Sequence, residues 1–230
     1  MQTPRYSDPA YAWAVQEQAR LRERLAERPL PPDVRWVAGA DVSCHRFGRT
    51  FWGGMVVCDL AAGLAPADRA VVRMEVDFPY LPGLLGFREV PVLAAAFARL
   101  KLRPDVVLCD AHGIAHPRGF GAAAHLGVVL GVPTVGCAKS RLCGEFAAPP
   151  PDRGAASPLV LEGRTVGAVL RTRAGVAPVF VSPGHLADLS GSLALVLACA
   201  PRLRLPEPVR LAHALVNAAR RGEVACDDAG

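Results

Sequence analysis

Runs of apolar residues are separated by turn-forming residues along most of the chain. In the first third of the chain these runs predict strands. Strand-like runs occupy residues 35–44, 50–60 and 69–76, with turn signals between them at 45–48 and 62–63. Because consecutive strands joined by short turns pair antiparallel, we expect a three-strand antiparallel meander.

From residue 87 onward, helices alternate with strands. Helices are expected at 87–101 and 121–130, and each precedes a compact apolar strand, at 105–110 and at 132–138. Strands that are separated by helices usually pair in parallel. A meander followed by such units predicts an α/β protein with a ribonuclease H-like fold, in which a mixed sheet is flanked by helices.

Weaker signals indicate the remaining elements. Asp8 and Pro9 supply an N-cap and a first-turn proline for a helix. The other expected elements are a helix at 10–27, a loop at 147–157, a hairpin at 158–171 that turns at Glu162 and Gly163, a strand at 179–182, and helices at 186–200 and 208–221. We expect one domain over residues 1–230, with an N-terminal helix and linker at 1–32, a catalytic core at 33–221 and a flexible tail at 222–230.

The composition is that of a folded, basic protein. Hydrophobic residues make up 51% and charged residues 20% of the chain, which excludes a largely disordered protein. The formal net charge of +5 favours a polyanionic partner such as nucleic acid. An ordinary basic surface explains this charge equally well, so the motifs must decide.

The cysteines and the N-terminal residues indicate an intracellular setting. Seven cysteines, an odd number without a C-x-x-C pair, are expected to be buried reduced thiols and not disulfides or zinc ligands. The first eight residues show no basic segment followed by an apolar one, and no apolar run reaches the ~18 residues of a membrane span. We therefore expect a cytoplasmic protein without membrane association.

Acidic residues interrupt segments that should be buried. Asp41 lies inside an expected strand, and Asp110 lies at the carboxyl end of another, where α/β sheets place ligands. Taken alone, Asp41 fits a turn cap, and Glu89 fits a helix start, where an acid complements the helix dipole. If the two strands are neighbours, the three carboxylates converge, and such oxygen donors select Mg²⁺ or Mn²⁺. That arrangement indicates phosphodiester hydrolysis.

A series of segments resembles the successive motifs of the endonuclease V family. They are 37–43 (VAGADVS), 79–83 (PYLPG) with 87–89 (FRE), 110–118 (DAHGIAHPR), 138–144 (AKSRLCG), 182–185 (SPGH) and 205–208 (LPEP). They stand in the family's order and spacing, and the resemblance covers approximately residues 33–220. A single motif can arise by chance, whereas the set is specific.

The resemblance implies a DNA repair enzyme that depends on Mg²⁺, with Mn²⁺ as a possible substitute. It implies hydrolysis of the second phosphodiester bond 3′ to deoxyinosine, leaving 3′-hydroxyl and 5′-phosphate ends. Inosine-containing RNA is a second candidate substrate, because some relatives cut it. The family's metal carboxylates correspond to Asp41, Glu89 and Asp110, and we expect a monomer.

Three further residues complete the expected catalytic set. Lys139 matches the family's active-site lysine and is one of only two lysines in the chain, which suits a compact charge beside a phosphate. A solvated surface lysine is the alternative, and the position directly after an apolar strand disfavours it. His116 is expected to contact phosphate or assist protonation, or else to be a loop histidine with a backbone partner. His213 matches a position at which relatives carry Asp or His, and it is expected to contact either metal or substrate.

Tyr80 stands between two prolines, where a rigid loop can insert an aromatic ring into the gap left by an extruded base. Packing of the loop explains an aromatic residue as well. The other expected substrate contacts are Pro82, Gly83, Gly113, Gly136, Arg118 and Leu142. The glycines would let backbone groups approach hypoxanthine closely, although each is also a plausible turn glycine.

The chain departs from the family at three positions. Ala111 replaces a usual glycine beside the expected base pocket, Gly119 replaces an arginine, and Ala124 replaces a serine. None of these removes an expected metal ligand, so we expect activity to survive. Two other classes stay open: another ribonuclease H-like nuclease, such as a junction resolvase or a ribonuclease H, and a non-catalytic nucleic-acid-binding protein whose carboxylates serve folding only.

Overall fold

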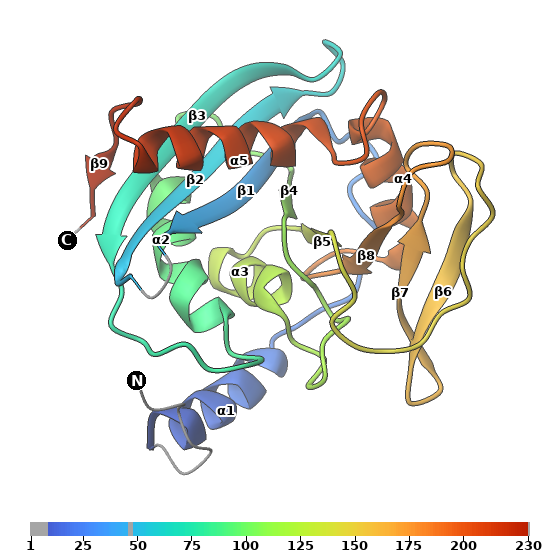
Figure 1. The fold of residues 1–230 in the computed structure, drawn as a ribbon, viewed down its shortest axis with the longest axis horizontal. Coiled ribbons are helices and arrows are strands. Elements are labelled where there is room, and N and C mark those ends of the chain that lie inside the picture. Colours follow the sequence, from blue (N-terminus) through green and yellow to red (C-terminus); the bar gives the residue numbers. More distant parts are fainter. Residues whose placement is uncertain (1–8, 46–47, 230) are drawn as a thin grey trace.

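The computed structural model describes residues 9–45 and 48–229 (Figure 1). The Asp8 cap and the centre of the expected turn at 45–48 lie outside these residues. The helices are α1 (Pro9–Arg22), α2 (Gly86–Arg99), α3 (Ala122–Leu130), α4 (Leu189–Cys199) and α5 (Glu207–Arg220). The strands are β1 (Trp36–Cys44), β2 (Thr50–Asp59), β3 (Ala65–Glu75), β4 (Val106–Cys109), β5 (Thr134–Ala138), β6 (Ala156–Leu161), β7 (Arg164–Leu170), β8 (Val179–Pro183) and β9 (Asp227–Asp228).

The described strands form one nine-stranded sheet in the order β6-β7-β8-β5-β4-β1-β2-β3-β9. β1, β2 and β3 pair antiparallel, which confirms the meander. β4 pairs in parallel with β1 on one side and with β5 on the other, as the strand and helix alternation predicts. The expected α/β architecture with a ribonuclease H-like mixed sheet is therefore confirmed.

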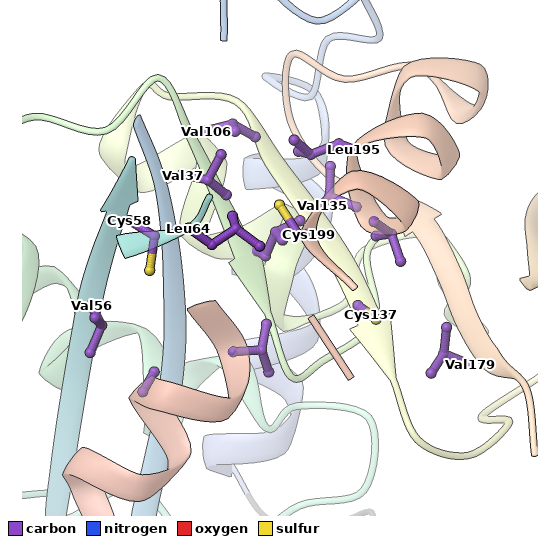
Figure 2. Packing of buried hydrophobic residues seen from close by; sticks show 14 of the residues in the cluster. Val37, Val56, Cys58, Leu64, Val106, Val135, Cys137, Val179, Leu195 and Cys199 are labelled. Carbon is purple, nitrogen blue, oxygen red and sulfur yellow. The ribbon is translucent and has the colours of Figure 1, made fainter. Parts of the chain in front are cut away.

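Successive residues of the central strands point to opposite faces of the sheet, and each face has its own hydrophobic core. Val37, Val106 and Val135 pack in the core that includes α4 and α5 (Figure 2). Their sequence neighbours Ala38 and Val107 belong to a second core with α2 and α3. Because helices cover both faces, the central strands read as continuous apolar runs and not as an alternating pattern.

The seven cysteines are all free. Four of them, Cys58, Cys109, Cys137 and Cys199, are buried, and the other three are half-buried. Burial raises the pKa of Cys58 to about 11 and that of Cys199 to about 12, so these thiols stay protonated and pack as small apolar side chains. The expectation of reduced thiols is confirmed, and that of burial holds for these four.

α1 is shorter than its Arg- and Glu-rich sequence predicts. The helix ends at Arg22, and not near residue 27. The backbone of Ala26 bonds instead to the segment that precedes α4: its N–H donates to His185 Nδ1 at 3.2 Å, and its carbonyl accepts from the Leu186 N–H at 2.7 Å. These tertiary hydrogen bonds outweigh helix propensity, which is a weak preference per residue.

Part of the segment 222–230, for which a flexible tail is expected, contains the short strand β9. β9 pairs in parallel with β3, which would otherwise end the sheet. Asp227 pairs with Arg99 at 2.6 Å, and Asp228 pairs with Arg73 at 3.3 Å. A short acidic segment can dock here because β3 offers free backbone groups and the two arginines offer positive charge. The sequence pattern does not show that β3 has this free edge.

β1 and α5 come into direct backbone contact at Gly39. A Cβ atom at this position would lie 2.0 Å from the carbonyl carbon and oxygen of Pro208. Gly54 of β2 faces the same helix, but a Cβ atom there would first meet the Val216 side chain, at 2.7 Å. The separation of α5 from β1 therefore depends on the missing side chain of Gly39.

We predict that Gly39→Ala lowers the free energy of unfolding by about 3 kcal/mol, because the added methyl group meets backbone atoms that no side-chain rotation can remove. Urea denaturation of both variants measures the effect. Gly54→Ala is the matched control and should cost about 1 kcal/mol, since the Val216 side chain can adjust. Equal losses in the two variants would contradict a special role for the Gly39 contact.

Candidate active site

Asp41 and Asp110 lie beside each other because β1 and β4 are parallel neighbours. Ala40 pairs with Cys109, the last residue of β4, and the Asp110 N–H donates to the Ala40 carbonyl at 3.3 Å. β4 ends at this point while β1 continues to Cys44. The two aspartates, expected from sequence at separate strands, are thus brought to one place where the sheet opens.

Each aspartate has a nitrogen-containing partner. His213 of α5 places Nδ1 2.7 Å from Asp41 Oδ2. Lys139, which directly follows β5, forms an ion pair with Asp110. Ligand atoms of Asp41, Asp110 and His213 lie within 4.8 Å of one another, which makes them, within the described part of the chain, the group suited to hold a metal ion.

Glu89 reaches the same place from α2. Together with Asp41 and Asp110 it lines a cavity of about 10 Å³, roughly the space of one water-sized species. Burial, reinforced by the two aspartates, raises the pKa of Glu89 from 4.5 to about 8. Burial also raises the pKa of Asp41, against the opposing effect of its hydrogen bond with His213. The cluster is therefore short of positive charge.

The donor atoms of this cluster fit a hard divalent cation. Asp41, Glu89 and Asp110 offer carboxylate oxygens, which Mg²⁺ and Mn²⁺ prefer, and a cation would relieve their mutual repulsion. The Cys109 thiol lines the same cavity. Burial and the neighbouring carboxylates raise the pKa of Cys109 far above its usual range, so no soft thiolate competes for the ion.

A second cavity, of about 360 Å³, adjoins the carboxylates. Asp110 and Lys139 belong to its wall, so the cavity and the carboxylate cluster share a boundary. Tyr80, Gly83 and Leu142, which are three of the expected substrate contacts, also line it. The Tyr80 side chain is 59% exposed and that of Leu142 is 48% exposed, so both present apolar surface where a ligand would enter.

The loop that carries Tyr80 is held by the carbonyl of Gly83. This oxygen accepts hydrogen bonds from Arg118 Nη2 at 2.6 Å, His116 Nε2 at 3.0 Å and Gln18 Nε2 at 3.2 Å. Gln18 also accepts a hydrogen bond from Arg118 Nε at 2.5 Å. Sequence reasoning missed Gln18, because nothing in a polar helix indicates that one glutamine is buried against a distant loop.

His116 is buried, and both of its ring nitrogens have backbone partners. The Arg118 N–H donates to Nδ1 at 3.1 Å, so Nε2 carries the proton that is donated to Gly83. Burial, together with the Arg118 charge, lowers the pKa of His116 to about 4. The ring is neutral at pH 7, and this geometry favours the loop-histidine alternative over a proton donor.

The remaining expected substrate contacts have other surroundings. Pro82 is exposed on the Tyr80 loop, and Arg118 holds that loop through Gly83. A Cβ atom at Gly113 would lie 1.9 Å from the Pro183 carbonyl oxygen, and one at Gly136 would lie 2.5 Å from the Gly113 nitrogen. These two glycines serve the close packing of the loop after β4 against β5 and β8.

The fold and the carboxylate cluster together place the protein in the class of metal-dependent nucleases built on a ribonuclease H-like sheet. The family model described as Endonuclease V matches residues 19–214. The chain therefore belongs to the endonuclease V family, and it is a deoxyinosine-specific DNA repair endonuclease. The Asp41, Asp110 and His213 group is the candidate site for the metal on which this family depends.

Similar proteins cover nearly the whole chain. Endonuclease V of Myxococcus xanthus is 49% identical over 211 residues, which span 91% of this chain and 89% of that protein. The crystal structure of endonuclease V from Streptomyces avermitilis is 42% identical and has a TM-score of 0.88, covering 93% of this chain and 94% of that one. The Ciona intestinalis enzyme, solved with a 23mer DNA that contains an inosine, shares the fold at 24% identity and a TM-score of 0.82, covering 94% and 99% of the two chains.

None of the described helices has the length and apolar character that crossing a membrane requires. Ala111, one of the three departures from the family, lines the larger cavity. Ala124 is fully buried in the small core that joins α1 to α3. The departure at Ala111 therefore changes the surface that the larger cavity offers to a ligand.

We predict that Glu89→Gln changes the pH dependence of stability in the metal-free protein. The folded-state pKa of Glu89 is raised from 4.5 to about 8, so between these values the folded state keeps a proton that the unfolded state has lost. Stability must then fall as pH rises through this window. Melting temperatures with chelator should show this fall in the unsubstituted protein and a smaller fall in Glu89→Gln.

Glu162→Gln, on the exposed hairpin turn, is the control for that measurement. It should follow the unsubstituted protein at every pH. If Glu89→Gln also follows it, Glu89 is ionised in the metal-free protein and the burial effect is absent.

Proposed function

We propose that this protein binds deoxyinosine in the larger cavity and hydrolyses the second phosphodiester bond 3′ to it, leaving 3′-hydroxyl and 5′-phosphate ends. The observation that carries this proposal is the shared wall: Asp110 belongs both to the cavity and to the carboxylate cluster. A base held in the cavity keeps the phosphates that follow it close to the carboxylates, which is the positioning that catalysis needs.

Asp41, Glu89 and Asp110 are the proposed ligands of Mg²⁺, with Mn²⁺ as a substitute. When bound, such an ion supplies positive charge at the scissile phosphate and makes water a stronger nucleophile. The chain contributes rigidity, because two of the three carboxylates stand on adjacent strands of the central sheet. The position of the carboxylates is therefore fixed before the substrate arrives.

Lys139 is the proposed second source of positive charge. Its side chain is 41% exposed and pairs with Asp110, so the ammonium group lies at the boundary that the carboxylate cluster and the larger cavity share. A phosphate that follows a bound base meets this group directly. A compact ammonium charge suits this task, because it does not impose the planar two-point geometry of an arginine.

Tyr80 is the proposed wedge that fills the space of the extruded base. Its ring is exposed. Gly83, three residues further along the same loop, has a carbonyl that accepts hydrogen bonds from three donors. An exposed aromatic ring on an anchored loop can stack against neighbouring bases without losing much conformational freedom. Inosine-containing RNA presents the same base, and it is the second proposed substrate.

We predict that Asp41→Asn and Asp110→Asn each lower the cleavage rate by more than about 100-fold while DNA binding persists. Loss of a residue that only orients a metal ligand typically costs about 10- to 100-fold, and loss of the metal ligand itself should cost more. The assay uses end-labelled duplex DNA and single-stranded RNA, each with one inosine and a matched adenine control, with Mg²⁺ and with chelator. Cleavage by Asp110→Asn at the unsubstituted rate would refute the assigned site.

Two control substrates separate the alternative classes in that assay. Branched DNA and an RNA–DNA hybrid, both without inosine, are cut by a junction resolvase or a ribonuclease H. We expect neither to be cut. Binding without any cleavage would instead favour a non-catalytic nucleic-acid-binding protein.

We predict that Tyr80→Ala raises KM for inosine-containing DNA about tenfold with little change in kcat, because stacking against a base is worth roughly 1–3 kcal/mol. Steady-state kinetics on the same duplex measures both constants. Tyr80→Phe keeps the ring and should retain the KM of the unsubstituted enzyme. A large loss in kcat with an unchanged KM would assign Tyr80 to the chemical step.

A further inference from the structure

Asn217 stands one helical turn after His213 on α5 and is the only asparagine in the sequence. Its side-chain Nδ2 donates to the His213 carbonyl at 2.8 Å and lies 3.2 Å from His213 Nε2. Its Oδ1 accepts from the Ser43 hydroxyl at 2.9 Å. The side chain thus links α5 to β1, two residues beyond Asp41.

The orientation of the Asn217 amide follows from its partners. The His213 carbonyl is an acceptor only, so the amide group that faces it must be the NH₂ group. The same NH₂ group faces His213 Nε2, which therefore accepts, and the ring proton lies on Nδ1. Nδ1 in turn donates to Asp41 Oδ2 at 2.7 Å. The hydroxyl of Ser43, the amide, the imidazole and the carboxylate form one directed chain of hydrogen bonds.

This chain of hydrogen bonds is possible because the rise along one turn of α5 is close to the rise along two residues of β1. Two strand residues span about 6.6 Å, and four to five helix residues span about 6 to 7.5 Å. Gly39, Asp41 and Ser43 therefore face successive turns of α5, which begin with Pro208 and continue with His213 and Asn217. Asn217 occupies a helical position that reaches both Ser43 and the His213 ring.

We propose that Asn217 is a positioning residue: with Ser43, it holds His213 so that the ring donates to one oxygen of Asp41 and leaves the other oxygen to the metal ion. This inference rests on the proposed function of Asp41 as a metal ligand. Partners that orient a ligand in this way contribute about 10- to 100-fold in metal affinity or activity. His213 thereby acts on the site through Asp41.

A purely structural role for Asn217 makes a different prediction about metal binding. If Asn217 did no more than tie α5 to β1 through its hydrogen bonds, Asn217→Ala would lower thermal stability and leave metal affinity unchanged. Metal affinity therefore separates the two roles.

The test is a titration of the substrate-free protein with Mn²⁺ alone. Electron paramagnetic resonance of the free ion measures how much Mn²⁺ is bound. We expect Asn217→Ala to weaken Mn²⁺ binding about tenfold, measured below the melting temperatures of both variants. Ser190→Ala, an exposed polar residue of α4, is the matched control and should bind Mn²⁺ like the unsubstituted protein. Unchanged Mn²⁺ affinity in Asn217→Ala would overturn the proposal.

A double-substitution cycle tests whether Asn217 acts through His213. In a His213→Ala background, Asn217→Ala should cause no further loss of Mn²⁺ affinity, because the group it positions is gone. Independent, additive losses would refute the positioning role. Complete loss of binding in His213→Ala would make that ring a direct ligand and would also refute it.

The unsubstituted protein distinguishes failure of this inference from failure of the proposed function. If it binds no Mn²⁺, the assignment of the carboxylates as metal ligands fails and the inference falls with it. If it binds Mn²⁺ and Asn217→Ala binds equally well, the carboxylate assignment stands and the positioning role of Asn217 is refuted.

Discussion

At Gly39 the backbone of α5 rests on β1 with no side chain between them, since a Cβ atom there would lie 2.0 Å from Pro208. This approach fixes both the height and the register of the helix over the strand. Each further pair of strand residues then meets the next helical turn, so Asp41 receives His213 and Ser43 receives Asn217. The contacts of α5 with Asp41 and Ser43 follow from this one close packing.

Three carboxylates gathered at the opening between β1 and β4 are costly without a compensating charge. The protein reduces this cost in different ways at each residue. Asp41 accepts a hydrogen bond from His213, Asp110 pairs with Lys139, and Glu89 keeps its proton because burial raises its pKa to about 8. The site is thus folded but still lacks positive charge beside its carboxylates, and a bound divalent cation would supply that charge.

The cavity beside the carboxylates is shaped by hydrogen bonds and not by hydrophobic packing alone. The Gly83 carbonyl collects donors from α1 and from the loop after β4, and so it anchors the segment on which Tyr80 is exposed. His116 serves this anchoring with both ring nitrogens. The proposed base-binding cavity and the proposed metal site therefore depend on two separate hydrogen-bond networks, and the cavity and the carboxylate cluster share Asp110.

The sequence alone determined the order of the elements, the meander and the parallel strands. It also singled out Asp41 and Asp110 as acids inside apolar runs. The spacing of apolar residues, the turn residues and an acid inside an apolar run are all local signals. Glu89 and His213 needed the family resemblance, since an acid in a first helical turn is unremarkable. Only the tertiary structure decided the partners of Gln18 and Asn217. Gly83 lies 65 residues from Gln18, and Ser43 lies 174 residues from Asn217. A hydrogen bond depends on where a side chain points in the folded molecule, which no local pattern records.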